Sequence, residues 1–153
     1  MISEQVEKLV NSFLNEHQNI FLVEKKVSAS NQIEILIDSF DHISIKDCVM
    51  LSRHIESNLN RDETDFSLQV ASAGLSEPFK VFDQYKKYIG KDVDVLLKGG
   101  QRVIGKMLEA NEKKGLVIET KKKEKIGKKK VEVVDTHSYP FDKIEKTKIV
   151  ISF

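Results

Sequence analysis

The sequence is short of several residue types on which common functions depend. Its only cysteine is Cys48, so no internal disulfide can form and no Cys-x-x-Cys or Cys/His ligand pair exists. A lone thiol favours a reducing compartment and argues against structural zinc. The first twenty residues carry Glu4, Glu7 and Glu16, and no later stretch approaches eighteen apolar residues. We therefore expect a cytoplasmic protein with neither a secretory signal nor a membrane span, and with no cofactor.

Catalytic and stacking residues are also scarce. The four histidines, His17, His42, His54 and His137, are dispersed, and no Gly-rich phosphate loop precedes a helix. With no tryptophan, the chain offers little for stacking on single-stranded bases. These absences disfavour an enzyme, although catalytic partners can meet in space from distant positions. A polar pocket with a titratable pair of groups would indicate one.

The net charge of +1 hides an uneven distribution. Residues 1–80 contain 7 Lys and Arg against 13 Asp and Glu, a net charge of −6. Residues 81–153 contain the other 18 basic and 11 acidic residues, a net charge of +7. Such asymmetry bears on partners, and it indicates an acidic partner for the C-terminal half, most commonly nucleic acid.

Residues 1–80 have the pattern of a small α/β domain. Apolar residues at helical spacing near positions 6–14 predict an amphipathic helix. Extended segments over about 21–28 and 32–39, with a polar turn between them, predict a hairpin. Ser44 and Asp47 form a Ser-x-x-Asp capping box, which predicts a second helix starting there. Alternation over 66–72 predicts a third strand, giving the order αββαβ: a three-stranded sheet covered by two helices.

The second helix carries one apolar stripe at steps of three or four residues. It consists of Ile45, Cys48, Leu51, Ile55 and Leu59, which we expect to pack on the hairpin. Cys48 is thus predicted to be a buried structural thiol rather than a reactive one, since reactive thiolates need an accessible, electropositive site.

Residues 81–153 have the pattern of a small β-barrel. One or two helical turns near 82–89 precede five short strand signals, over 93–97, 103–108, 116–120, 131–134 and 149–151. Gly99-Gly100 predicts a tight turn, Gly105 a bulge, and residues 111–115 a longer turn. Pro140 to Ile144 is similar to the single helical turn before the last strand of SH3-like and Sm-like barrels. The fold class is α+β, an α/β domain followed by an SH3-like/Sm-like barrel.

A lysine-rich run, residues 121–130, lies between two of these strands. Its seven lysines are Lys121, Lys122, Lys123, Lys125, Lys128, Lys129 and Lys130. In a long hairpin turning at Gly127 they would form a flexible cationic arm that contacts RNA phosphates without base specificity. Alternatively, they form a solvated loop that keeps a sheet edge from pairing with another chain. We weigh the two nearly evenly, with RNA contact slightly ahead.

Two segments of the sequence resemble the ribosome maturation factor RimP family, bacterial proteins that assist assembly of the small ribosomal subunit. Ser44 to Glu56 is similar to the family's aspartate-cysteine helix, which contains Asp47 and Cys48 here. The segment from Val70 to Phe79 is similar to its Val-Ser-Ser-Pro-Gly-Leu-Asp-Arg-Pro-Leu elbow. The resemblance covers nearly the whole chain, and its domain order agrees with the pattern.

The elbow also departs from the family. Ala73, Ser76 and Glu77 replace its Pro, Asp and Arg, so a phosphate contact at position 77 is excluded. Ser72, Gly74, Leu75 and Pro78 are retained. Because glycine and proline mainly set the path of the backbone, we interpret these residues, with Asp47, as a structural joint between the domains.

The resemblance implies a non-enzymatic assembly factor that binds immature small (30S) subunits through ribosomal RNA and a ribosomal protein. We expect a monomer. The alternatives are a general Sm-like RNA-binding module, which would form a closed ring, and an enzyme.

Overall fold

The chain forms two compact units, one ending at Gly74 and the other beginning at Leu75. This computed structural model describes residues 2–151. The first unit contains α1 (Ile2–Glu16), β1 (Ile20–Val27), β2 (Gln32–Ser39), α2 (Ile45–Asn58) and β3 (Ser67–Ser72). The second contains α3 (Phe82–Lys87), β4 (Asp92–Leu97), β5 (Arg102–Asn111), β6 (Gly115–Ile126), β7 (Lys129–Tyr139), the 3₁₀ turn η1 (Phe141–Lys143) and β8 (Ile144–Ile149). No helix among residues 2–151 combines the length and the apolar character that a bilayer crossing needs.

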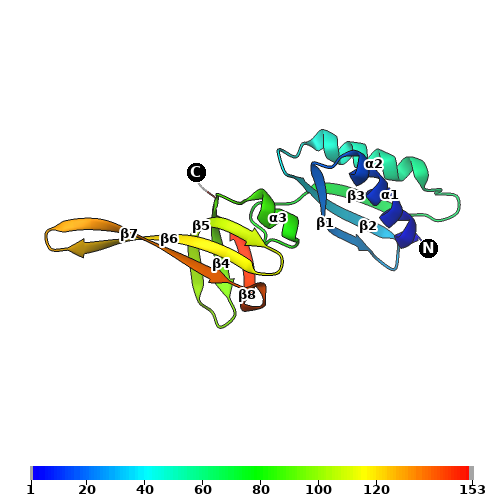
Figure 1. Cartoon of the computed structure of the whole chain (residues 1–153). Coiled ribbons are helices and arrows are strands. Elements are labelled where there is room, and N and C mark those ends of the chain that lie inside the picture. The colour runs from blue at the N-terminus through cyan, green and yellow to red at the C-terminus, as the bar shows by residue number, and fades with distance from the viewer. Residues whose placement is uncertain (1, 152–153) are drawn as a thin grey trace. The chain divides into compact units, whose positions relative to one another are not determined.

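The first unit is a three-stranded sheet with both helices on one face (Figure 1). β2 is central, antiparallel to β1 and parallel to β3, and the intervening α2 provides the crossover that a parallel pair requires. Ile33, Ile35 and Ile37 of β2 point to the helices and are at most 1% exposed. The predicted αββαβ order, its hairpin and its two helices are confirmed.

The apolar stripe of α2 is shorter than predicted. Cys48, Leu51 and Ile55 are buried in the core with Val10 of α1. Ile45, however, is 85% exposed, so its predicted place in the stripe is wrong. It is the first residue of the helix, directly after the capping Ser44, and the core does not reach this end.

The second unit is an antiparallel sheet in the order β7-β6-β5-β4-β8. Its core comes from alternate residues of the strands, including Val93, Val95, Leu116 and Ile118, all fully buried. Within the described residues β7 and β8 are not paired with each other, so the sheet is not closed by hydrogen bonds. The coarse prediction of an α/β unit followed by a β unit is confirmed, whereas closure into a barrel is not observed.

Two details of this sheet differ from the prediction. Gly105 pairs in regular register with Val93, and the bulge of β5 lies instead between Met107 and Glu109. A Cβ at Gly105 would collide with the backbone carbonyl oxygen of Glu119, so glycine is needed here for the close approach of β6.

The last strand also starts earlier than predicted, at Ile144 rather than Ile149. Its inward residues are Ile144 and Thr147, and Thr147 is 1% exposed. The polar threonine can be buried because its Oγ1 accepts a hydrogen bond from the Tyr85 hydroxyl at 2.9 Å. Val150 and Ile151, which looked like strand residues, lie beyond it and are exposed.

Candidate nucleic-acid interface

The lysine-rich run is part of a continuous two-stranded ladder, not a loop between shorter strands. β6 and β7 pair without interruption from Leu116 with Tyr139 to Ile126 with Lys129. Gly127 and Lys128 make the turn, and Gly127 has a φ of 64°, which favours glycine. Lysine has a low strand propensity, so the sequence pattern ended both strands too early.

The distal part of this ladder is here called the arm, residues 120–135. β5 pairs with β6 only as far as Lys106 with Glu119, so beyond that point β6 and β7 bond only to each other. Figure 1 shows the hairpin extending past the other strands of the sheet. All seven lysines of the arm are exposed. The arm therefore presents its side chains to solvent on both faces.

The arm carries few compensating acids. Lys121 Nζ lies 3.8 Å from Glu132 Oε1, which is an ion pair between exposed groups. For the other six lysines no ion pair is found among residues 2–151. Since ammonium groups remain positively charged at neutral pH, the arm can attract phosphates by charge alone.

Asp47, a residue of the family motif, acts in the capping box at the start of α2. Its Oδ2 accepts from the Ser44 backbone NH at 3.0 Å, and its own NH donates to Ser44 Oγ at 3.3 Å. The two contacts satisfy backbone donors that a helix start leaves without partners. The geometry gives Asp47 a structural task in which both of its polar groups are engaged.

Cys48 faces the core beside Asp47. Burial raises the pKa of its thiol, and the negative charge of Asp47 raises it further. Both effects keep the thiol protonated at neutral pH, and a protonated thiol is a poor nucleophile. The predicted structural character of Cys48 agrees with this environment.

The elbow is anchored on both of its sides. Before it, Ala73 donates its backbone NH to Ile37 of β2 at 2.9 Å. After it, Phe79 donates to Thr147 of β8 at 2.8 Å, and its ring packs edge-on against Tyr85 with centroids 4.9 Å apart. Between these anchors lie Gly74, Leu75 and Pro78, while Ser72 is the last residue of β3. The retained family residues thus occupy the chain between the last contact of one unit and the first of the other.

Glu77, which replaces a basic residue of the family motif, is ion-paired. Its carboxylate lies 3.8 Å from Lys80 Nζ. Leu75 is 55% exposed, so its side chain is not needed for either core.

The structure brings together one pair of residues that sequence analysis missed. Ser12 Oγ of α1 and His54 Nε2 of α2 lie 2.9 Å apart. Ser12 also bonds to the Leu9 carbonyl oxygen at 2.9 Å, both groups are exposed, and no carboxylate is found to orient the imidazole. No local signal could have found this pair, because the two positions are 42 residues apart. Without a third partner or a cavity, the pair has no catalytic arrangement.

The other histidines do not form a site either. His17 stacks on Phe13 at 4.1 Å and its Nδ1 lies 3.0 Å from the Phe13 carbonyl oxygen. His137 stacks near Tyr139. Across residues 2–151 no cluster of His, Cys, Asp or Glu has the composition of a metal site.

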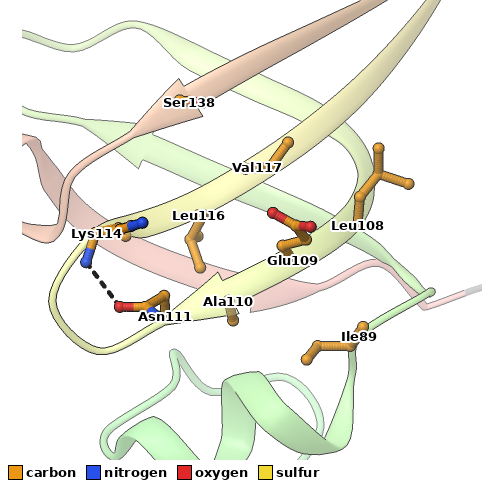
Figure 2. A pocket seen from close by; sticks show the side chains of 10 residues that line it. Ile89, Leu108, Glu109, Ala110, Asn111, Lys114, Leu116, Val117 and Ser138 are labelled. Atoms are coloured by element: carbon orange, nitrogen blue, oxygen red, sulfur yellow. Dashed lines mark hydrogen bonds between the residues drawn. The ribbon is translucent and has the colours of Figure 1, made fainter.

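A pocket of about 640 Å³ lies in the second unit, where β5 and β6 meet the segment after α3. Figure 2 shows Ile89, Leu108, Val117 and Ser138 around it. At one end, the side-chain oxygen of Asn111 accepts from the Lys114 backbone NH at 3.0 Å, which fixes the predicted turn. Its ionisable lining residues, Glu109 and Lys114, are exposed. The pocket holds no buried pair of titratable groups suited to acid-base chemistry.

Known proteins similar to the chain point in one direction. Residues 6–76 match the RimP N-terminal domain family. A ribosome maturation factor RimP of Christiangramia forsetii is 36% identical over the full length of both chains. That of Flavobacterium psychrophilum is 36% identical over 98% of this chain and 97% of its own. The one from Porphyromonas gingivalis is 38% identical over 69% of this chain and 68% of its own.

Proposed function

The chain belongs to the ribosome maturation factor RimP family, and from that membership we propose that it is a cytoplasmic, non-enzymatic assembly factor for the small ribosomal subunit. The observation that carries the proposal is the full-length similarity to a ribosome maturation factor, covering both units. The chemistry of the chain supports it, since the candidate residues present charge and backbone geometry rather than a nucleophile with its base.

Binding energy is the proposed mechanism. An assembly factor that binds one folding state of an RNA-protein particle more tightly than another shifts the particle toward that state. The second unit supplies the cationic surface, and Lys121, Lys122, Lys123, Lys125, Lys128, Lys129 and Lys130 are the candidate contacts to ribosomal RNA. The acidic first unit restricts the orientation of binding, because like charges repel it from the phosphate backbone.

The architecture has a finer proposed assignment. The five-stranded sheet with its 3₁₀ turn before β8 supports an SH3-like/Sm-like barrel, open between β7 and β8. We propose an α/β domain over residues 1–80, the barrel domain over 81–153, and a joint formed by Ser72, Gly74, Leu75 and Pro78. Asp47 supports this arrangement by fixing the start of α2.

The direct test is sedimentation of a lysate in a sucrose gradient, followed by detection of the protein in each fraction. We expect it with free small subunits and not with translating ribosomes. Equal association with both would contradict the proposal. A general Sm-like RNA-binding module, the second candidate, would instead form a ring oligomer, so a monomeric mass in analytical ultracentrifugation separates the two.

A further inference from the structure

The two faces of the arm differ in chemistry, and the register shows which residue lies on which face. Leu116 and Ile118 of β6 are buried in the core, so Val117 and Glu119 point to the opposite, outer face of the sheet. Because the β6–β7 ladder has no bulge, this alternation continues to the tip. Directly paired residues share a face, so each β7 residue lies on the face of its partner.

The outer face of the arm is the cationic one. Lys121 is paired with Val134, Lys123 with Glu132, and Lys125 with Lys130. These pairs place four lysines and one glutamate on a single face. Same-face neighbours along a strand are about 6.6 Å apart, so the lysines form a compact array that can meet several phosphates at once.

The inner face, which continues the core side of the sheet, is mixed. Its pairs are Lys122 with Val133, Glu124 with Val131, and Ile126 with Lys129. Two lysines are thus accompanied by one glutamate and three apolar side chains, with Ile126 62% exposed. Apolar side chains gain nothing from proximity to phosphates, so this face is poorly matched to a nucleic-acid backbone.

The rest of the outer face also favours contact with an anionic backbone. Val93 and Val95 of β4 are buried, so Asp94 and Leu96 point outward with their β8 partners Lys148 and Lys146. Asp94 is already engaged by Arg102. Basic residues therefore lie on the same face at the far edge of the sheet, and the outer face is cationic at both ends.

We propose that the RNA phosphate backbone binds to the outer face of the arm, through Lys121, Lys123, Lys125 and Lys130, and that the inner and turn lysines, Lys122, Lys128 and Lys129, do not contact it. This inference rests on the proposed function, because it names the partner of the same hairpin. It replaces seven equivalent candidates by a sided array of four.

Two triple variants with the same loss of charge test the proposal. In the full-length protein, K121Q/K123Q/K125Q removes three outer lysines, and K122Q/K128Q/K129Q removes the three others from the same segment. Binding to small-subunit ribosomal RNA is titrated from 50 to 200 mM salt. The outer triple is expected to reduce the slope of log K against log salt by about 2–3, at about 0.7–0.9 per phosphate contact, and the matched triple to leave it unchanged. Equal losses from both variants, or a loss from the matched triple alone, would overturn the sidedness.

A footprint checks the same assignment without any variant. Wild-type protein is acetylated with an amine-reactive reagent, with and without the RNA, and each lysine is quantified by mass spectrometry. Protection is expected at the four outer lysines and not at Lys122 or Lys129. Uniform protection along the run contradicts the proposal.

The outcome is separable from that of the proposed function. If the wild type sediments with small subunits while neither triple changes the salt slope, the arm inference fails and the family function stands. If the outer triple loses subunit binding but keeps the RNA slope, the face meets an acidic protein instead, which also overturns the RNA assignment. If the wild type itself does not associate with small subunits, the proposed function fails.

Discussion

The chain uses an antiparallel hairpin twice, and the two hairpins are held in different ways. The β1–β2 hairpin lies under α1 and α2, and its isoleucines fill the core. The arm of β6–β7 has both faces in solvent and depends on its backbone ladder alone beyond Glu119. Burial therefore constrains the side chains of the first hairpin, whereas those of the arm are constrained mainly by charge. The same local structure can serve as a core element or as a display surface.

The largest effect expected from this contrast is on stability. Ile37→Ala in β2 removes a fully buried side chain and leaves a cavity, which should lower the free energy of unfolding by about 2–5 kcal/mol. Ile126→Ala at the end of the arm should change it by no more than about 0.5 kcal/mol. Urea denaturation of both variants measures the difference. Similar losses would show that the arm packs against other parts of the protein.

The helix cover of the first hairpin should respond less. Asp47→Ala removes a side chain that caps the start of α2, with an expected loss of about 1 kcal/mol. The comparison is Asp62→Ala, an exposed carboxylate in the loop after α2, which removes the same charge with a smaller loss. Both are read from thermal unfolding. An equal loss would mean that Asp47 acts by charge and not by capping.

A smaller, binding-only effect is expected on the arm. Glu132→Gln removes the acid of the outer face and releases Lys121, so the salt slope of RNA binding should become steeper by about 0.7–0.9. Glu124→Gln removes the same charge from the inner face and should leave the slope as it is. Filter binding at several salt concentrations measures both. If the two variants behave alike, only the net charge of the arm matters.

The smallest effect is the pH dependence from Cys48. The folded state raises the pKa of this thiol above its value in the unfolded chain, so the stabilisation is fully present below the unfolded value, near pH 8.5, and is lost as the pH rises through the folded one. The free energy of unfolding of the wild type should fall more steeply above about pH 8.5 than that of Cys48→Ala. Parallel curves would contradict the assigned burial of the thiol.

Features coded by neighbouring residues could be predicted from the sequence. The capping box of Ser44 and Asp47 and the Gly99-Gly100 turn depend on side chains and backbone angles within a few positions, and both are found as expected. The helices and strands of the first unit were also predictable, because their apolar residues recur at the spacing of the element. Residue spacing therefore carries most of the architecture.

Features that depend on distant partners were not predictable. The strands of the arm extend through the lysines because each bonds to the other across Gly127, although lysine itself does not favour a strand. The early start of β8 depends on Tyr85, which lets Thr147 be buried. The two faces of the arm follow from a register without bulges, and this too is a property of the paired strands. For the candidate site, the sequence could indicate the lysines but not their division between faces.

The position of β8 in the sheet has a consequence for how the protein folds as it is synthesised. β1, β2 and β3 are all available once the chain has emerged to Ser72, so the first unit can fold while the rest is being translated. β4 pairs with β8, and the whole of β5, β6 and β7 lies between them. We expect the second unit to stay incomplete until β8 has left the ribosomal exit tunnel, so that its cationic surface matures last.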